Sequence, residues 1–148
     1  MVKIAQEEVL KYQKGRRSQE TVRRHYLNWR SQQDPPMPVR CDNPECTFYT
    51  APLIWNGKDL KLILDHKNGV NGDNRPKNLR FLCPNCNSQE PTFGGGNKSR
   101  VKQSAGGFAQ KSDDGKFHYT LPAEAGKLEL NGDKIKTTHR KKTPNKIL

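Results

Sequence analysis

Two pairs of cysteines constrain this sequence more than any other feature. Cys41 and Cys46 have four residues between them, whereas Cys83 and Cys86 have two. Each pair encloses a proline, and paired thiolates at such spacings are typical of the knuckles of a tetrahedral zinc site. We therefore expect a four-cysteine zinc site that joins the beginning of a domain to its end. Two disulfides or free thiols are the alternative.

The choice between these alternatives depends on the compartment. The longest unbroken apolar run, residues 62–64, is too short for a membrane span or for the core of a signal peptide. We expect a soluble, cytoplasmic protein without membrane contacts. Cytosolic thiols stay reduced, which favours zinc over disulfides.

The excess of basic residues lies outside the cysteine-bounded segment. Residues 1–40 carry nine Lys and Arg against four acids, and residues 98–148 carry twelve against five, whereas residues 41–97 carry six of each. Neutralising phosphates releases condensed counterions, so basic flanks suit a polyanion such as nucleic acid. With only 31% hydrophobic residues in 148, we expect one small, metal-stapled core with arms rather than two domains.

Residues 1–31 are predicted to form a helical arm. Apolar residues recur at three-to-four spacing over residues 3–31, Gly15 is a candidate break, and Ser18 is a candidate N-cap for a second helix. The polar positions are filled by Arg16, Arg17, Arg23, Arg24, His25 and Arg30. Two roles stay open: a pair of DNA-docking helices, or a scaffold hairpin with a solvated basic face, which charge runs more often form. Residues 32–40, rich in proline, are predicted to be a linker.

The central segment, residues 41–97, is predicted to contain a hairpin, a long loop and a short helix. Residues 53–55 and 60–64 flank Asn56-Gly57, which favours a tight turn between strands. Asp65-His66 follows the second strand, and residues 67–76 are dense in turn residues. Residues 78–82 are predicted to be extended, and Pro84 suits the first turn of a helix.

Residues 41 to about 100 resemble the HNH nuclease module. The resemblance is carried by three motifs in order, Asp65-His66, Asn78-Leu79-Arg80 and Cys83-Pro84-Asn85-Cys86. It implies an α+β fold: a ββα-metal (His-Me) finger stapled by the four-cysteine zinc site, with a helical N-terminal arm and a basic C-terminal extension over residues 98–148. It also implies a bacterial or phage-infected cell as the setting.

The resemblance assigns a role to each motif residue. Asp65 and Asn87 would bind a catalytic divalent cation, His66 would be the general base that takes a proton from water, and Asn78 would hold the histidine's loop through a side-chain-to-backbone hydrogen bond. A cation stabilises the charge that develops on a phosphodiester leaving group, and imidazole is a natural base at neutral pH. Hydrolysis in this family leaves a 5′-phosphate and a 3′-hydroxyl.

Asn87 stands where the family most often has histidine. An amide oxygen is a hard donor, so we expect Mg²⁺ or Mn²⁺ at this position. We expect a DNA endonuclease, with a restriction enzyme, a junction resolvase and a nuclease subunit of a phage-packaging or defence assembly all open, as is a homodimer or larger assembly. The alternative is a non-catalytic, zinc-stapled nucleic-acid-binding module in which Asn87 marks lost activity.

Contact with DNA is expected mostly through phosphates. The candidate cations are Arg75 and Arg80 within the module and Lys98, Arg100 and Lys102 after it, with an ordinary linker as the alternative for the last three. Farther on, alternation around Phe117, Tyr119 and Leu121, and again around Leu128 and Leu130, indicates a hairpin that turns at Asn131-Gly132. His118 and His139 are not expected to take part in chemistry.

Overall fold

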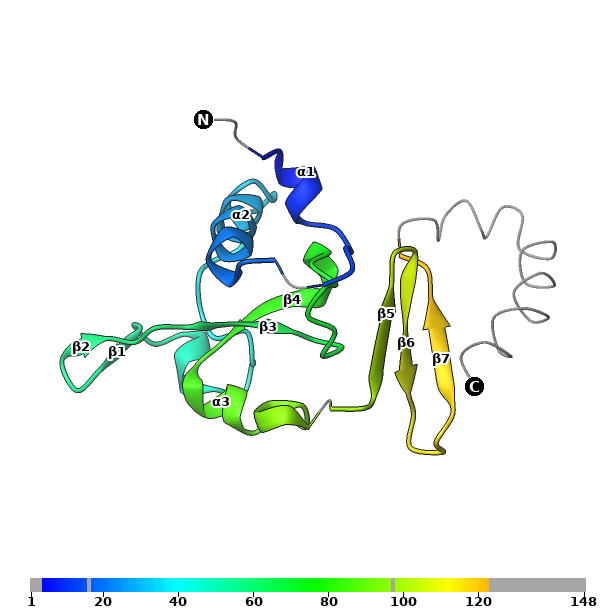
Figure 1. The fold of residues 1–148 in the computed structure, drawn as a ribbon. Coiled ribbons are helices and arrows are strands. Elements are labelled where there is room, and N and C mark those ends of the chain that lie inside the picture. Colours follow the sequence, from blue (N-terminus) through cyan, green and yellow to red (C-terminus); the bar gives the residue numbers. More distant parts are fainter. Residues whose placement is uncertain (1–3, 16, 97, 123–148) are drawn as a thin grey trace.

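The computed structural model describes residues 4–15, 17–96 and 98–122, which form a mixed helix and sheet fold (Figure 1). The helical elements are α1 (Gln6–Val9), α2 (Gln19–Ser31), η1 (Thr47–Tyr49), η2 (Pro76–Asn78), α3 (Pro84–Ser88) and η3 (Phe93–Gly95). The strands are β1 (Ile54–Trp55), β2 (Lys58–Asp59), β3 (Ile63–His66), β4 (Leu79–Leu82), β5 (Val101–Ser104), β6 (Gly107–Lys111) and β7 (Phe117–Thr120). No helix in these described ranges has the length and apolar character needed to cross a membrane.

The antiparallel hairpin of β3 and β4 is the centre of the fold. In the register Ile63 lies opposite Leu82, and His66 lies opposite Leu79. In Figure 1, α2 lies above this hairpin and α3 below it. The main hydrophobic core fills the space around the hairpin and contains Val9, Leu10, Val22, Tyr26, Leu62, Leu64, Leu79, Phe81, Leu82 and two of the cysteines. The buried face of β4 explains why a largely polar chain can still build a core here.

The N-terminal arm is less helical than the sequence predicts. α2 begins directly after Ser18 as expected, but α1 spans only four residues. Tyr12 leaves the helical path because it forms an antiparallel bridge with Asp73 and packs its ring on Phe108, 5.3 Å between centroids. The Tyr12 hydroxyl lies 2.7 Å from the carbonyl oxygen of Gly107, to which it donates a hydrogen bond. These long-range contacts outweigh the local helical preference of the sequence.

Arg30 fills neither role predicted for the arm's basic residues, because its side chain is buried rather than docked on DNA or solvated. Only 1% of the residue is exposed, and its guanidinium makes two hydrogen bonds to the Asp42 carboxylate, at 2.8 and 3.0 Å. It also lies over the ring of Phe81, 5.2 Å from the centroid. A buried guanidinium needs such partners because desolvation of an unpaired charge is costly. Arg30 therefore joins α2 to the segment that carries the first cysteine pair.

Substituting Arg30 should destabilise the fold strongly. Arg30→Met keeps most of the aliphatic volume but leaves the Asp42 carboxylate without its guanidinium, and we expect the free energy of unfolding to fall by about 3 kcal/mol. Urea denaturation measures this loss. Arg24→Met, on the exposed side of the same helix, is the matched control and should change little. Equal stability of the two variants would show that the buried pair makes no net contribution.

The predicted turn at Asn56-Gly57 is present, but its second strand was assigned the wrong length and partner. β1 and β2 pair as a two-residue ladder around this turn, with both turn residues at positive φ, 51° and 76°. The chain then continues into β3, which pairs with β4 rather than with β1. β3 is half-buried while β1 and β2 are exposed, so core burial decides which segment becomes the long strand.

The C-terminal extension contains a three-stranded antiparallel sheet in the order β5-β6-β7, beside the central hairpin in Figure 1. The alternation predicted around Phe117 and Tyr119 falls on β7, the edge strand beside β6. The predicted hairpin that turns at Asn131-Gly132, after Leu128 and Leu130, lies outside the described residues. The β5–β6 pair was not predicted from the sequence. Phe108 of β6 packs with Tyr12 and Val70 in a second, smaller core.

Candidate functional site

The four cysteines form a cluster, although they are up to 45 positions apart in the sequence. Their sulfur atoms all lie within 4.8 Å of one another, and the sulfurs of Cys46 and Cys83 are 3.7 Å apart. A tetrahedron with Zn–S bonds of about 2.3 Å has an edge of about 3.8 Å, so the donor set fits zinc. All four are free cysteines, which excludes the disulfide alternative in this structure.

Hydrogen bonds to sulfur support the cluster. The backbone N–H of Phe48 donates to Cys46, that of Cys86 donates to Cys83, and the Asn43 amide donates to Cys86, each at 3.4 Å. Such donors stabilise thiolates and orient metal ligands.

The ionisation of the cysteines shows what a cation would contribute. Burial raises the pKa of the Cys86 thiol to about 12, against the opposing hydrogen bond from Asn43. Burial also raises the pKa of Cys46, whereas at Cys83 burial is outweighed by hydrogen bonds from the Cys86 backbone and neighbouring thiols, so that pKa is lowered. Without a cation the cluster therefore keeps protons that a bound metal would displace.

Asp65 and His66 lie at the carboxyl end of β3, next to the long loop. Opposite them on β4 are Arg80 and Leu79, respectively. Arg80 donates to Asp65 Oδ2 at 2.7 Å and to Glu90 at 2.5 Å. The side chain of Asp65 is only 11% exposed, so the ion pair is partly shielded from water.

His66 has a defined partner that the sequence analysis missed. Its Nε2 lies 2.7 Å from Oδ1 of Asn74, a residue only 2% exposed. In the tautomer that carries its proton on Nε2, the ring donates this hydrogen bond to the amide oxygen, and Nδ1 is then the basic nitrogen. From the sequence alone, Asn74 is one of several turn-forming residues, and nothing distinguishes it from its neighbours.

Asn78 joins the two ends of the loop that follows His66. Its Oδ1 accepts from the backbone N–H of Asn68 at 3.1 Å, and its Nδ2 donates to Asn68 Oδ1 at 2.9 Å and to the carbonyl of Asp73 at 2.8 Å. The backbone N–H of Lys67 adds a bond to the Asn78 carbonyl at 2.8 Å. Asn78 itself is buried, so these bonds are protected from competition with water.

Asn87 lies on α3, which packs against β3 and β4. Pro84 occupies the first turn of this helix, as predicted, and the backbone N–H of Asn87 donates to the backbone carbonyl of Cys83 at 2.9 Å. The side-chain amide is half-buried and has no hydrogen-bond partner within the described ranges. The turn that carries Cys83 and Cys86 thus fixes the backbone of Asn87, whose side-chain amide stays available.

The five candidate DNA-binding cations fall into two groups. Arg75 is bound to the fully buried Asp73 at 2.6 and 2.7 Å, and Arg80 is held by two carboxylates, so both guanidiniums are engaged within the chain. Lys98 is exposed, and Arg100 donates to the carbonyl of Lys111 at 2.8 Å. Lys102 lies on β5 over the ring of Phe117. Asp73 is a second structural residue of the loop that the sequence analysis did not single out.

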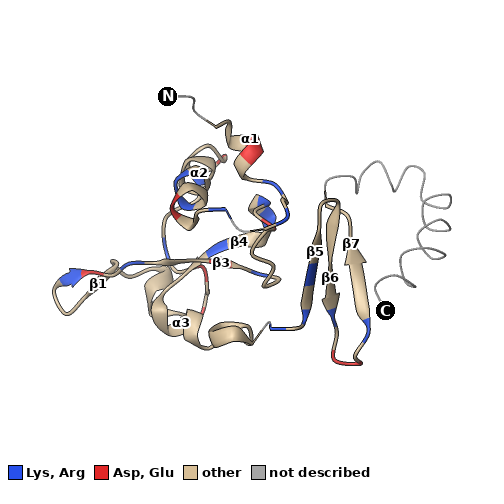
Figure 2. Cartoon of the chain, viewed as in Figure 1, with Lys and Arg blue, Asp and Glu red and all other residues tan. Residues whose placement is uncertain are grey.

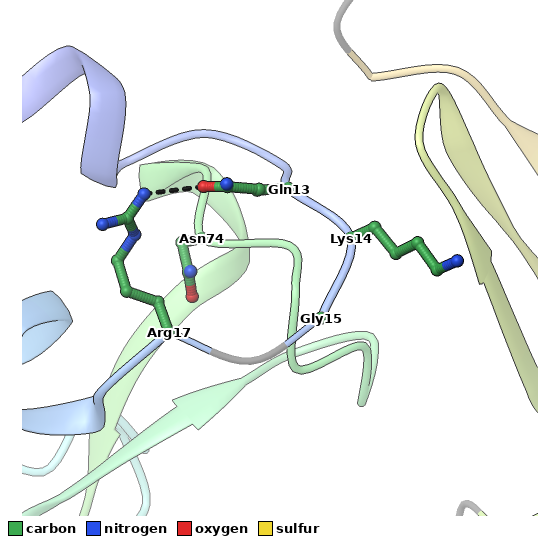
Figure 3. A pocket seen from close by; sticks show the side chains of 5 residues that line it. All are labelled: Gln13, Lys14, Gly15, Arg17 and Asn74. Carbon is green, nitrogen blue, oxygen red and sulfur yellow. Dashed lines mark hydrogen bonds between the residues drawn. The ribbon is translucent and has the colours of Figure 1, made fainter.

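A pocket of about 290 Å³ borders Asn74 (Figure 3). It is lined by Gln13, Lys14, Gly15, Arg17 and Asn74. Arg17 donates to the Gln13 side chain at 2.6 Å, and the Lys14 side chain extends away from Asn74. The pocket therefore lies next to the residue that pairs with His66, but its two cations do not converge on it.

Comparison with known proteins gives one informative relative. The H-N-H endonuclease F-TflIV of Escherichia phage T5 is 44% identical to this chain over 49 residues, which is 33% of this chain and 22% of the phage enzyme. The chain thus spans about a fifth of the length of that relative. No protein-family profile and no solved structure matches the sequence. Taken with the four-cysteine cluster, the partial match supports a relationship to the HNH endonucleases and a nuclease function in general.

Proposed function

We propose that this protein is a DNA endonuclease with the ββα-metal arrangement, formed by β3, β4 and α3. His66 is the general base, Asp65 and Asn87 are the protein ligands of a single Mg²⁺ or Mn²⁺, and the four cysteines hold a structural zinc. The observation that carries this proposal is the pairing of His66 with Asn74 beside a loop whose two ends Asn78 joins. The similarity to the T5 enzyme supports the same interpretation.

The proposed base acts through Nδ1. In the tautomer in which Nε2 donates to Asn74, the ring can accept a proton from an attacking water at Nδ1 without turning. The positive charge that then develops stays next to the Asn74 carbonyl oxygen, which is oriented to stabilise it. Asn74 is therefore a positioning residue for His66.

The residues near Asp65 fit a hard divalent cation. Arg80 occupies Oδ2 of Asp65, and Oδ1 makes no hydrogen bond to any described residue, so one carboxylate oxygen is available. The Asn87 amide adds a second oxygen donor of the type that Mg²⁺ and Mn²⁺ prefer. A cation bound by these groups would supply charge stabilisation to the phosphodiester and its leaving oxygen. One such site cuts one strand, so a monomer nicks DNA and a double-strand break requires two copies or two events.

A plasmid assay tests the proposal. Supercoiled DNA incubated with the zinc-loaded protein should be converted to open-circle or linear products with Mg²⁺ or Mn²⁺, and should stay supercoiled with no added divalent cation. Discrete fragments would identify a sequence-specific enzyme. Products should carry 5′-phosphates, which ligase detects directly.

One observation favours the second candidate, a non-catalytic nucleic-acid-binding module. The Asp65 carboxylate is paired with Arg80 at 2.7 Å, as it would be in a purely structural ion pair. Mobility shifts of DNA without cleavage under every cation would select this candidate and reject the nuclease.

Asn78 should be needed for activity more than for stability. Asn78→Ala removes three side-chain hydrogen bonds from the loop after His66, so we expect a loss of about 2 kcal/mol in the free energy of unfolding and at least a tenfold slower cleavage. Amide hydrogen exchange over residues 68–73 should speed up in parallel. Asn85→Ala, an exposed asparagine on α3 whose side chain makes no hydrogen bond among the described residues, is the control. Full activity of Asn78→Ala would reject the positioning role.

A further inference from the structure

The sheet of β5, β6 and β7 has two chemically different faces. Opposed residues share a face, and the register places Lys102, Ala109 and Tyr119 in one row across the sheet. Because side chains alternate along each strand, Ser104, Gly107, Lys111 and Phe117 lie on this same face, which we call the outer face. The residues on the opposite, inner face are Val101, Gln103, Phe108, Gln110, His118 and Thr120.

The inner face is already occupied by the loop that follows His66. Phe108 packs against Val70, the Gln110 amide donates to the carbonyl of Asn68 at 2.8 Å, and Gln103 donates to Asn71 at 2.9 Å. These contacts fix the sheet on the rest of the protein. The outer face is therefore the surface that the sheet can offer to a partner.

Side chains of the two outer strands meet above the small residues of the middle strand. Ser104 and Tyr119 are joined by a hydroxyl–hydroxyl hydrogen bond of 2.9 Å, and the Lys102 ammonium lies 4.5 Å from the centroid of the Phe117 ring. Ala109, in the same row between Lys102 and Tyr119, is only 3% exposed although it lies on the outer face. These pairs also hold the Lys102 charge in place, which lowers the entropy cost of binding an anion there.

The outer face is positively charged. Lys102 and Lys111 are exposed on it, and no described residue on this face of the three strands is acidic. The acids of the region, Asp113 and Asp114, lie in the turn between β6 and β7, the red segment in Figure 2, and Asp114 is bound by Ser112 and the Lys116 backbone. Tyr119, 40% exposed, adds a hydroxyl to the same surface.

We propose that the outer face of this sheet binds the phosphate backbone of duplex DNA. Lysine ammoniums and tyrosine and serine hydroxyls are the side-chain groups that contact phosphates and position a protein on DNA. The inference rests on the proposed function for the choice of DNA as the polyanion. It adds Lys111 and Tyr119 to the candidate DNA-binding residues. It also places Lys102 on a defined surface, the outer face of the sheet, rather than only in a basic stretch of sequence.

The orientation of this surface separates binding from chemistry. The inner face contacts the His66 loop, so the outer face is directed away from it, and its lysines cannot contact the reacting phosphate. Loss of these lysines should therefore raise KM for DNA and leave kcat unchanged.

The test compares two pairs of lysines in the full-length, zinc-loaded protein. Lys102→Gln/Lys111→Gln alters the outer face, and Lys58→Gln/Lys61→Gln removes the same charge from the exposed residues in and after the β1–β2 hairpin. Binding to a 20-base-pair duplex is measured on a His66→Ala background, so that cleavage does not interfere. Near 0.1 M salt we expect the outer-face pair to weaken binding about tenfold per lysine and to reduce the slope of log K against log salt by about two.

Each outcome decides the matter. An unchanged slope, an equal loss from the control pair, or a loss confined to duplex RNA would overturn the proposal. Lys111→Gln alone, which removes no contact among the described residues, should give half of the slope change even if Lys102→Gln disturbs the sheet. If the outer-face variant reduces the salt slope but the wild-type protein never cuts DNA, this inference stands and the nuclease proposal is rejected. If the wild-type protein cuts DNA and the outer-face variant binds DNA as tightly as the wild type, the nuclease proposal stands and this inference is rejected.

Discussion

Substitution of His66 by alanine should reduce the rate of plasmid cleavage by about a thousandfold or more, with DNA affinity unchanged. General acid–base groups contribute factors of about 10² to 10⁴, and here Asn74 orients the His66 imidazole at the end of β3. The measurement is the single-turnover rate constant for nicking with saturating Mn²⁺, together with the dissociation constant for the same DNA. A large fall in the nicking rate constant with no change in the dissociation constant is the result expected for a general base.

The matched control is His25→Ala, which removes a half-buried histidine from α2. It should cut at the wild-type rate. Cleavage by His66→Ala at more than a tenth of the wild-type rate would remove this residue from the mechanism. If both variants lose activity together with their melting transitions, the loss is one of folding, so thermal denaturation accompanies each assay.

Removal of zinc should unfold the central part of the protein. Metal binding to structural cysteine sites contributes on the order of 10 kcal/mol to folding. This is comparable to the whole net free energy of unfolding of a small domain, so the fold should not survive its loss. The cluster connects the segment after Arg30 with the start of α3, and Cys41 and Cys83 are both buried in the main core. We expect Cys83→Ser, or chelation under reducing conditions, to abolish the cooperative thermal transition seen by circular dichroism.

A graded variant separates zinc binding from packing. Asn43→Ala leaves all four sulfurs but deletes the hydrogen bond to Cys86, and the loss of such a supporting bond costs about ten- to a hundredfold in metal affinity. Zinc release to a colorimetric chelator should therefore be faster than in the wild-type protein, with the fold retained. A stable, metal-free Cys83→Ser protein would show that the cluster is dispensable.

Local sequence patterns were enough to predict the four-cysteine cluster and the order of elements around it. Paired cysteines, the turn at Asn56-Gly57 and Pro84 at the start of α3 each express a short-range rule of backbone geometry or metal chemistry, and the structure has all three. Asp65-His66 also lies at a strand end, as expected. The roles of Asp65, His66, Asn78 and Asn87 stay predictions that the proposed assays address.

Contacts between distant segments were not predictable in the same way. Arg30 looks like one more basic residue of a helix until Asp42 and Phe81 are placed around it. Tyr12 leaves a helical pattern because its hydroxyl and ring find partners more than 90 residues later. The β5–β6 pair has few apolar residues of its own, and its strands form against a loop that a local pattern does not reveal.

Val70 is packed from two sides, by Tyr12 and by Phe108, and this limits how residues 41–97 could be transferred to another protein. Val70 is completely buried, with Tyr12 from before the segment and Phe108 from after it as its partners. Excising residues 41–97 would expose the Val70 side chain to solvent. It would also remove the packing that holds the turn containing Asn74 in place. The loop that positions the end of β3 thus depends on packing from both flanks, and the segment cannot be transferred without them.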